Sequence, residues 1–187
     1  RDVLGSRGLG DVYKRQSMGL TPLGGIPMVT RSGDLDPSVL TYLMKKENLS
    51  AQEMEDILNK KSGLMGISGL APDFRVMEEE SNNGNESAKI AIEEFNYAIA
   101  SYITKYAMAM DGADYIIFTG GIGENQVNIR KGICEKLTFM GVKLDNEANQ
   151  IRGEEKVIST EDSSIKMYVI PTNEELMIAK ETMNLVK

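Results

Sequence analysis

Residues 114–125 read Asp-Tyr-Ile-Ile-Phe-Thr-Gly-Gly-Ile-Gly-Glu-Asn, and this segment joins a strand to a helix. The apolar run from Tyr115 to Phe118 is rich in β-branched and aromatic side chains, which predicts a buried β-strand. A glycine-dense turn follows, and it leads into an amphipathic helix predicted to begin at about Asn125. Such a turn lets a ligand approach the backbone, and a helix start offers unpaired N–H groups. The segment could therefore hold an anionic nucleotide.

A plainer interpretation is that these glycines only make a tight turn between the strand and the helix. The segment does not complete the dinucleotide fingerprint G-x-G-x-x-G, because the third glycine is missing. Taken alone, the glycine spacing leaves both nucleotide binding and a purely structural turn open.

The composition of the chain predicts a globular protein with a substantial core. Its 187 residues are 41% hydrophobic, which suffices for one large domain or for a domain with an appendage. A net charge of -7 argues against a nucleic-acid or anionic-membrane partner, since both need basic patches. The single cysteine permits no intrachain disulfide, and no apolar run approaches the ~20 residues of a membrane span. We therefore expect a cytoplasmic protein.

The chain contains no histidine. It can therefore supply neither a histidine general base nor an imidazole metal ligand. A metal bound by these residues would be a hard ion held by oxygen atoms, and Mg2+ is the favoured candidate.

The first sixteen residues differ in character from the rest of the chain and show no clear hydrophobic period. We interpret residues 1–16 as a leader that is foreign to the domain, or as an artefact of sequence assembly. The alternative is an ordinary flexible terminus. The domain itself is then expected to span residues 17–187.

An irregular loop is predicted for residues 17–37, where prolines and two adjacent glycines interrupt an apolar stretch. Arg31 lies in this loop among small polar residues, so its guanidinium is free to meet a carboxylate or a phosphate with two donors. The alternative is a surface arginine paired with Asp34 or Asp36, and without further information we favour that pairing.

Capping residues predict two helices after this loop. Asp36 and Pro37 begin the first helix, and Ser50 with Glu53 forms a capping box for the second. The following residues, 63–75, are expected to be a glycine-rich stretch that closes in a turn.

Hydrophobic periods predict the elements of the second half. The longest helix is expected to end at about Met110, because apolar side chains recur at three- and four-residue steps from Ala88 onward. Strands are predicted over residues 156–159 and 166–170. Asn173 then caps a last helix, whose apolar stripe consists of Leu176, Ala179, Met183 and Val186.

Five segments, in this order and at similar intervals, resemble the acetate kinase family. They are Ser17-Met-Gly-Leu-Thr-Pro-Leu23, Thr30-Arg-Ser-Gly-Asp-Leu-Asp-Pro37, Asp73-Phe-Arg75, Phe118-Thr-Gly-Gly-Ile-Gly-Glu-Asn125 and Ile170-Pro-Thr-Asn-Glu-Glu175. The resemblance implies an α/β fold, a ribonuclease-H-like domain of the acetate and sugar kinase, Hsp70 and actin superfamily. In that superfamily two such domains clamp ATP and magnesium. The chain resembles most of the C-terminal nucleotide-binding domain, truncated at its N-terminal strands.

The resemblance also implies roles for individual residues. Arg31 would face acetate and the transferring phosphoryl group and stabilise the transition state. Glu174 would hold Mg2+, directly or through water, although an acid in the first turn of a helix is already explained by the helix dipole. The residues implied to contact ADP or ATP are Asp73, Phe74 and Arg75 on one wall, and Gly121, Ile122, Gly123, Glu124 and Asn125 on the other.

The implied reaction is the reversible transfer of the γ-phosphoryl group of ATP to acetate, which gives acetyl phosphate and ADP. The family's His-x-Gly-Asn-Gly phosphate loop and catalytic aspartate have no counterpart in this sequence, so we expect the isolated chain to be inactive. The alternatives are a fragment of a propionate or butyrate kinase, and a non-catalytic nucleotide-binding or dimerisation module. The family also implies a homodimer, for which Tyr102, Tyr106 and Met110 offer a surface.

Overall fold

The computed structural model describes residues 15–186, without the side chain of Glu174. Most of the expected leader, residues 1–14, therefore lies outside the described part of the chain. The chain divides into two compact units, Arg1–Ala109 and Met110–Lys187.

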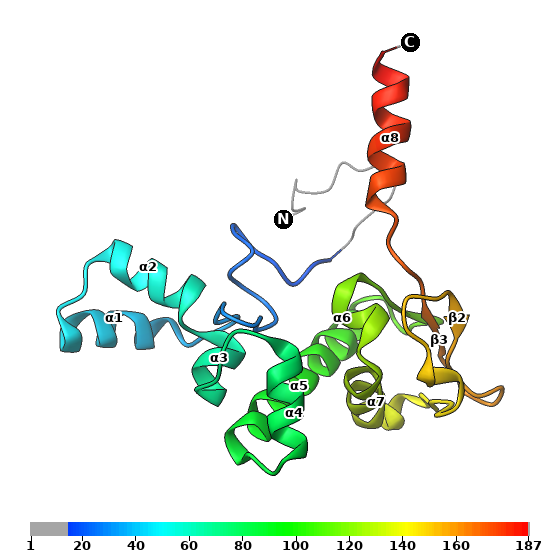
Figure 1. Ribbon diagram of the computed structural model, residues 1–187, viewed down its shortest axis with the longest axis horizontal. Coiled ribbons are helices and arrows are strands. Elements are labelled where there is room, and N and C mark those ends of the chain that lie inside the picture. Colours follow the sequence, from blue (N-terminus) through cyan, green and yellow to red (C-terminus); the bar gives the residue numbers. More distant parts are fainter. Residues whose placement is uncertain (1–14, 187) are drawn as a thin grey trace. The chain divides into compact units, whose positions relative to one another are not determined.

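The first unit is helical (Figure 1). Its described helices are α1 (Pro37–Glu47), α2 (Ala51–Lys60), α3 (Gly63–Ser68), α4 (Phe74–Asn82) and α5 (Glu86–Ala109). Residues 15–36 precede them without helix or strand, as the prolines and glycines of this segment predict. The long helix α5 contacts both α3 and α4, so it forms the spine of the unit.

The core of the first unit lies between α5 and the short helices. Leu64 of α3 and Met77 of α4 are fully buried, and Ala88 on α5 is also fully buried. The rings of Phe74 and Phe95 lie 5.7 Å apart in a tilted arrangement. Small alanines on α5 let the neighbouring helices approach closely, and the larger apolar side chains fill the space between them.

The predicted starts of α1 and α2 are confirmed. The carboxylate of Asp36 accepts the N–H of Ser38 at 2.8 Å, and proline follows as the first helical residue. At α2, the Ser50 hydroxyl accepts the N–H of Glu53, and the Glu53 carboxylate accepts the N–H of Ser50 in return.

Two helices of this unit, α3 and α4, were not predicted from the sequence. Gly63 and Gly66 make α3 a poor helix by propensity, so its six residues are helical because they pack against α5. The turn expected at residues 71–75 is instead the start of α4, where Asp73 accepts the N–H of Arg75 at 2.9 Å as the N-cap.

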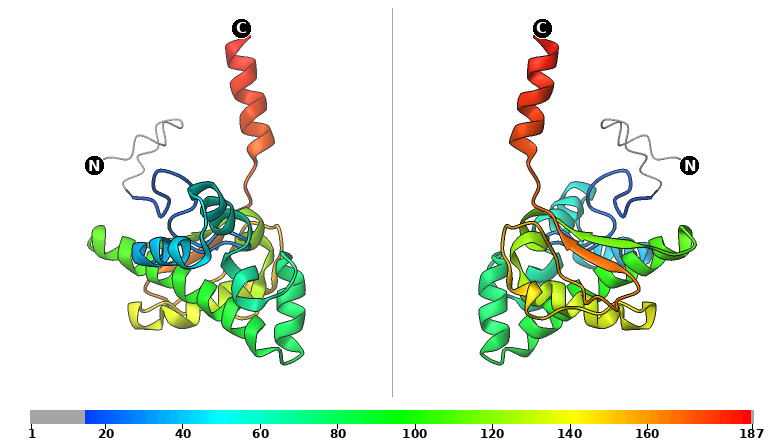
Figure 2. Two further views of the ribbon diagram at one scale, coloured as in Figure 1. Left: turned by 90° about the vertical axis from the view of Figure 1, so that its left-hand side faces the viewer. Right: turned by 90° about the vertical axis from the view of Figure 1, so that its right-hand side faces the viewer.

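The second unit contains a three-stranded sheet. Its elements are β1 (Tyr115–Phe118), α6 (Gly120–Asn125), α7 (Val127–Lys136), η1 (Thr138–Met140), η2 (Ala148–Gln150), β2 (Lys156–Val157), β3 (Lys166–Val169) and α8 (Glu174–Leu185). The strand order is β1-β3-β2, with β1 parallel to β3 and β2 antiparallel to β3. Figure 2 shows β1 and β3 side by side. The predicted strands are confirmed, although β2 is shorter than expected. The prediction that β1 is buried is wrong for one face of the strand, where Tyr115 and Ile117 are exposed.

One face of this sheet packs on α7. Ile116 and Met167 point to the buried face, and Ile133 of α7 is buried with them. The Sγ atom of Cys134 lies 3.2 Å from the Sδ atom of Met167, which places α7 against β3. Burial raises the pKa of Cys134 to about 12, so this thiol is an inert core group.

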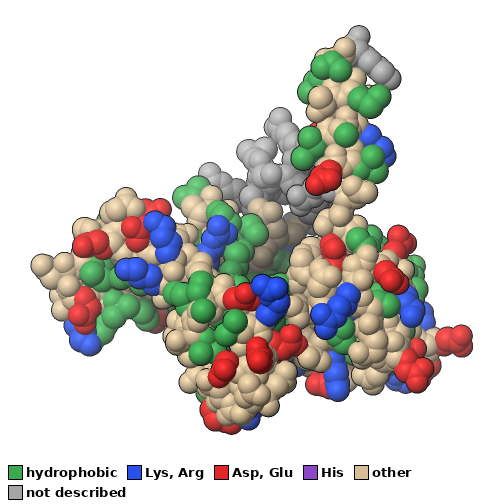
Figure 3. All heavy atoms as spheres, viewed as in Figure 1, with side chains coloured by type: hydrophobic (Ala, Val, Ile, Leu, Met, Phe, Trp, Pro, Cys, Tyr) green, Lys and Arg blue, Asp and Glu red, His purple; other side chains and the backbone are tan. Residues whose placement is uncertain are grey.

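The last helix carries its apolar side chains on an exposed surface. Asn173 caps α8 as predicted, because its side-chain oxygen accepts the N–H of Leu176 at 3.1 Å. Ile178 is 64% exposed and Leu185 is 86% exposed, and Figure 3 shows hydrophobic side chains along this helix. None of the described helices has both the length and the apolar character needed to cross a membrane.

Candidate functional site

Arg31 lies in a closed loop of the first unit, residues 25–34. The N–H of Asp34 donates to the carbonyl of Gly25 at 2.8 Å, and the N–H of Gly25 donates to Oδ1 of Asp34 at 2.8 Å. Inside the loop, the N–H of Met28 donates to the carbonyl of Arg31 at 3.0 Å. These three bonds fix the backbone on both sides of Arg31.

The junction between α2 and α3 holds this loop from one side. Ser62 donates its N–H to the carbonyl of Thr30, and Leu64 donates its N–H to the carbonyl of Met28, each at 3.0 Å. Gly63 lies between these two donors with φ +60, where a Cβ atom would stand 2.1 Å from the Met28 carbonyl oxygen. Only glycine allows the two segments to approach this closely.

The guanidinium of Arg31 has no carboxylate partner among the described residues. Its Nη1 atom lies 3.5 Å from the Sδ atom of Met28. Asp34 is engaged by Gly25 and by the hydroxyl of Tyr102, and Asp36 caps α1 through Ser38. The surface ion pair that we favoured from the sequence is therefore wrong for the described part of the chain.

The glycine-dense segment after β1 is a short helix and not an open turn. Gly120 begins it with φ +72, and the six residues of α6 end at Asn125. The next helix, α7, then begins at Val127, two residues later than predicted. The backbone at Gly121 faces open space, since a Cβ atom there would meet nothing within 4 Å. A planar ligand can therefore approach the backbone at Gly121.

Glu124 ties the carboxyl ends of β1 and β3 together. Its Oε1 atom accepts the N–H of Gly120 at 2.8 Å, the N–H of Thr172 at 2.8 Å and the hydroxyl of Thr172 at 2.9 Å. The bond from the Thr172 backbone is the main cause that lowers the pKa of Glu124, so the carboxylate stays ionised. One N–H at the start of α6 is thus already bonded and does not face a ligand.

Arg130 is a fully buried arginine that sequence reasoning missed. Its Nε atom donates to Oδ1 of Asn149 at 2.7 Å, and Nη1 donates to the carbonyls of Gly123 and Glu124 at 2.9 and 3.0 Å. Nη2 donates to the carbonyls of Asn149 and Ile151, both at 2.8 Å. Burial lowers the pKa of the guanidinium. Its donors bind α6 to the segment around η2.

A signal for this arginine was present in the sequence. Arg130 stands four residues before Cys134, and positions four apart share one helix face. Cysteine is among the residue types that are most often buried, so this face was the one to expect in the core. The amide of Asn149 closes the same cluster, because its Nδ2 atom donates to the carbonyl of Val127 at 3.0 Å. Asn149 itself carries no recognisable pattern in the sequence.

Asp73, Phe74 and Arg75 lie in the first unit, whereas residues 121–125 lie in the second. Arg75 is exposed and pairs with Asp73, with Nη2 and Oδ2 3.0 Å apart. Phe74 is buried against Phe95 and presents little surface to a ligand. In the other group, the side chain of Asn125 donates to the carbonyl of Gly121 at 3.0 Å.

The sequence profile of the acetokinase family matches residues 13–180. The chain belongs to the acetokinase family. It is 56% identical to an acetate kinase of Carboxydothermus hydrogenoformans over 170 residues, which are 91% of this chain and 42% of that protein. The chain thus spans less than half the length of the acetate kinases that it matches.

Solved structures of acetokinases have the same fold. The acetate kinase of Porphyromonas gingivalis matches with a TM-score of 0.86 and 46% identity, over 91% of this chain and 43% of that one. A propionate kinase from Francisella tularensis matches with a TM-score of 0.82 and 44% identity, over 88% of this chain and 42% of that one. The mixed α/β architecture is therefore a piece of the acetate and sugar kinase fold, as predicted.

The residue implied to hold magnesium stands at the start of the last helix. Glu174 is the first residue of α8, but its side chain lies outside the described part of the chain. Within that part, no three acidic or cysteine side chains gather closely enough to hold a metal ion. The magnesium role of Glu174 therefore stays a prediction.

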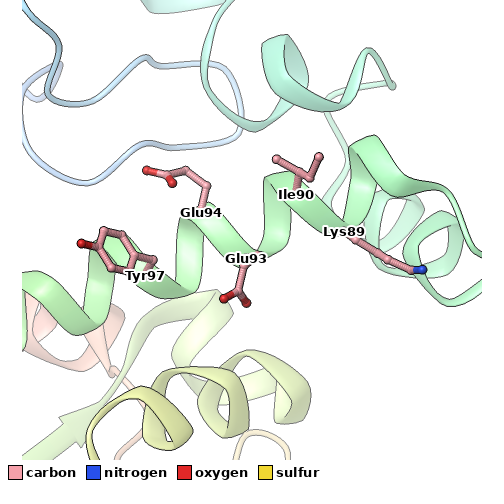
Figure 4. Close-up of a pocket in the computed structure, with 5 residues that line it drawn as sticks. All are labelled: Lys89, Ile90, Glu93, Glu94 and Tyr97. Carbon is pink, nitrogen blue, oxygen red and sulfur yellow. The ribbon is translucent and has the colours of Figure 1, made fainter.

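A shallow hollow along α5 contains none of the predicted acetokinase site residues. Figure 4 shows its lining, which comes from one helix and consists of Lys89, Ile90, Glu93, Glu94 and Tyr97. Positions 89, 93 and 97 follow one another at four-residue steps, so the hollow is an open strip of helix surface.

Proposed function

We propose that residues 17–187 are the C-terminal nucleotide-binding domain of a cytoplasmic acetate kinase. Such an enzyme transfers the γ-phosphoryl group of ATP to acetate, giving acetyl phosphate and ADP, and the reaction is reversible. The identity of 56% with an acetate kinase over 91% of the chain carries this proposal. Residues 1–16 are proposed to be a leader outside the domain.

Arg31 is the proposed transition-state stabiliser. Its guanidinium has no carboxylate partner among the described residues, and its backbone is fixed by the loop bonds of Gly25 and Asp34. Phosphoryl transfer spreads charge over the equatorial oxygens of the transferred group, and a fixed cation placed there lowers the barrier. The same guanidinium can pair with the carboxylate of acetate through two donors.

The nucleotide is proposed to contact two groups of residues, Asp73–Arg75 and Gly121–Asn125. Support comes from the open backbone at Gly121, which leaves room for a planar group or a sugar. Glu124 is proposed to have two roles in residues 121–125. It contacts the nucleotide, and its bonds to Gly120 and Thr172 hold the backbone of this segment in position. Mg2+ supplies charge neutralisation of the phosphates in such reactions, and Glu174 is the residue proposed to hold it.

The isolated 187-residue chain is proposed to lack kinase activity, because it spans 42% of the length of the acetate kinase that it matches. An assay that traps acetyl phosphate with hydroxylamine tests this directly. A chimera tests the function: the N-terminal part of the Carboxydothermus hydrogenoformans acetate kinase is joined to residues 17–187.

The chimera is expected to form acetyl phosphate, and Arg31→Ala is expected to lower its turnover by about 100-fold or more. Lys45→Ala is the control, because Lys45 is an exposed cation of α1 and is not one of the proposed site residues. Turnover by the isolated chain, or an active Arg31→Ala chimera, would contradict the proposal.

A second candidate function is that of a propionate kinase, which the match to the Francisella tularensis enzyme favours. A second chimera, with the N-terminal part of that propionate kinase, separates the two functions. If both chimeras prefer acetate over propionate and butyrate, residues 17–187 set the preference. If each chimera prefers the substrate of its N-terminal donor, residues 17–187 do not determine which carboxylate is used, and the assignment to acetate fails.

A homodimer is also proposed, as the family resemblance implies. Tyr102 and Tyr106 are partly covered within the first unit, so the exposed part of the proposed surface is centred on Met110, which is 57% exposed. Sedimentation of the active chimera at several concentrations tests it, and a strict monomer would contradict it.

A further inference from the structure

A carboxylate stands close to Arg31 along the chain and does not pair with it. Asp34 follows Arg31 by three residues, in the same loop that the Gly25–Asp34 bonds close. Ion pairing between the two would neutralise the guanidinium and occupy the donors that an anionic substrate needs. The structure shows both carboxylate oxygens of Asp34 bonded elsewhere.

The first oxygen of Asp34 belongs to the loop itself. Oδ1 accepts the N–H of Gly25 at 2.8 Å, and this bond closes the loop beside the Asp34–Gly25 backbone bond. The second oxygen, Oδ2, accepts the hydroxyl of Tyr102, which comes from α5, 68 residues away along the chain. A residue from the spine of the unit thus reaches the base of the Arg31 loop.

The hydroxyl of Tyr102 is held in place by its surroundings. Its ring packs against the ring of Tyr106 with centroids 5.7 Å apart, and the Nζ atom of Lys105 lies 5.1 Å from the Tyr102 centroid. The bond to Asp34 is the main cause that raises the pKa of Tyr102 to about 12 and lowers the pKa of Asp34. Tyrosine therefore stays the donor and aspartate the ionised acceptor.

We propose that Tyr102 is a positioning residue, whose O–H occupies Asp34 and thereby keeps the Arg31 guanidinium unpaired for a carboxylate or phosphoryl ligand. The inference rests on the proposed function, because it gives Arg31 an anionic substrate. Tyr102 acts through Asp34 and touches no reacting atom. Without the hydroxyl, Oδ2 of Asp34 would lack its partner. Two cations would then compete for it: Arg31 in the same loop, and Lys105, whose charge already acts on Asp34.

The test measures how fast phenylglyoxal modifies Arg31 in the 187-residue chain, with the modified peptide quantified by mass spectrometry. Wild-type Arg31 is expected to react readily. Tyr102→Phe is expected to slow the reaction about fivefold, the factor that a partly exposed ion pair contributes. Adding Asp34→Asn to Tyr102→Phe is expected to restore the wild-type rate, because asparagine can still accept from Gly25 but carries no charge.

Two controls accompany these variants. Tyr97→Phe removes a hydroxyl from a tyrosine on the same helix that is 60% exposed, and it is expected to leave the rate at Arg31 unchanged. Arg75, which is paired with Asp73, serves as the internal reference in every digest. Circular dichroism confirms that each variant keeps its helices.

Three outcomes would overturn the proposal. An unreactive wild-type Arg31 would mean that the guanidinium is not available. An unchanged or faster rate in Tyr102→Phe would mean that the hydroxyl only holds the loop. Failure of Asp34→Asn to restore the rate would remove Asp34 as the competing anion. Since none of these measurements uses turnover, they stand apart from the chimera assay, which alone decides the proposed function.

Discussion

Gly63 sets the position of the Arg31 loop at the scale of a single residue. It has a positive φ, and its missing side chain leaves room for two carbonyls, those of Met28 and Arg31, at 2.1 and 2.5 Å from where a Cβ would stand. These contacts are backbone contacts, so no side-chain movement can relieve a clash there.

We predict that Gly63→Ala destabilises the chain by about 3 kcal/mol or more, because left-handed strain adds to a backbone clash. Gly69→Ala is the matched control: Gly69 has φ +69, but a Cβ there would meet nothing within 4 Å. The control should lose only about 1 kcal/mol, the cost of the backbone conformation alone. Urea unfolding followed by circular dichroism measures both, and equal losses would contradict the close approach.

Glu124 gives a prediction for the pH dependence of stability. Hydrogen bonds from Thr172 lower the pKa of Glu124 below its ordinary value of 4.5, so the folded state binds this proton less tightly than the unfolded state. Its contribution to stability is therefore present above pH 4.5 and is lost as the pH falls through the lowered pKa. Glu124→Gln should remove this part of the pH dependence.

The measurement is the difference in urea midpoint between wild type and Glu124→Gln from pH 2 to pH 6, a range of about four units around the carboxylate pKa. We expect the difference to shrink as the pH is lowered. Glu147→Gln, a change at an exposed glutamate, should show no such trend. A constant difference across the range would mean that Thr172 does not bond the ionised form.

At the scale of elements, α7 anchors the second unit through one side chain. Arg130 makes all its described bonds to uncharged oxygens, on α6 and around η2. A buried cation without an anion is expensive, so its retention indicates that the five bonds are needed to hold the two segments together.

We predict that Arg130→Met lowers the stability of the chain by about 3–5 kcal/mol, because several buried carbonyls lose their donors at once. Arg130→Lys should restore only part of this loss, since lysine cannot reach four carbonyls in a fixed plane. Lys131→Met, a change at an exposed neighbour, should cost within about 0.5 kcal/mol. Urea unfolding distinguishes the three variants. If Arg130→Met left the free energy of unfolding unchanged, the bonds of Arg130 would not be what holds α6 to the segment around η2.

The sequence predicted most elements whose formation depends on local signals. The caps at Asp36 and Ser50 and the apolar run at 115–118 were sufficient for α1, α2 and β1. It did not predict α3 or α6, because glycines that weaken a helix locally are outweighed there by tertiary packing.

The site was predictable only where a motif matched a family. Arg31 and residues 121–125 came from that match, whereas their supports are contacts between distant segments. Tyr102 reaches Asp34 across 68 residues, and Thr172 reaches Glu124 across 48. No periodicity or local spacing records such pairings. Tyr102 was therefore predicted only as part of a dimer surface, and Glu124 only as a nucleotide contact.

At the scale of the whole molecule, the proposed site residues are shared between the two units. Arg31 and Asp73–Arg75 belong to the first unit, and Gly121–Asn125 and Glu174 belong to the second. Neither unit by itself carries the whole proposed set.

The exposed face of α8 gives a prediction for the whole chain. Its apolar residues are exposed to water, for example Met183, which is 57% exposed, and so is Val186 directly after the helix, which is 78% exposed. Deleting residues 174–187 should therefore lower the binding of the dye ANS severalfold while leaving the urea midpoint of the remainder within experimental error. A large loss of stability on deletion would show that α8 packs on the rest of the chain in solution.

A matched variant separates the apolar face from the helix itself. Ile178→Lys with Leu185→Lys keeps the helix but removes two side chains that are 64% and 86% exposed. It should lower dye binding nearly as much as the deletion, since dye binding depends on contiguous apolar surface. Unchanged dye binding would mean that the dye binds an apolar surface outside α8.

The parallel pairing of β1 with β3 has a consequence for the order of folding. Tyr115 pairs with Lys166, which lies 51 positions later in the chain. The chain therefore loses the entropy of closing a long loop before the strand hydrogen bonds can form. Helices α4 and α5 of the first unit contact each other over a shorter stretch of chain, since Phe74 packs against Phe95, 21 positions later. In refolding experiments the sheet should therefore form after the α4–α5 contact, and a ribosome-bound chain that has not yet emerged beyond β3 would expose β1 as an unpaired hydrophobic edge.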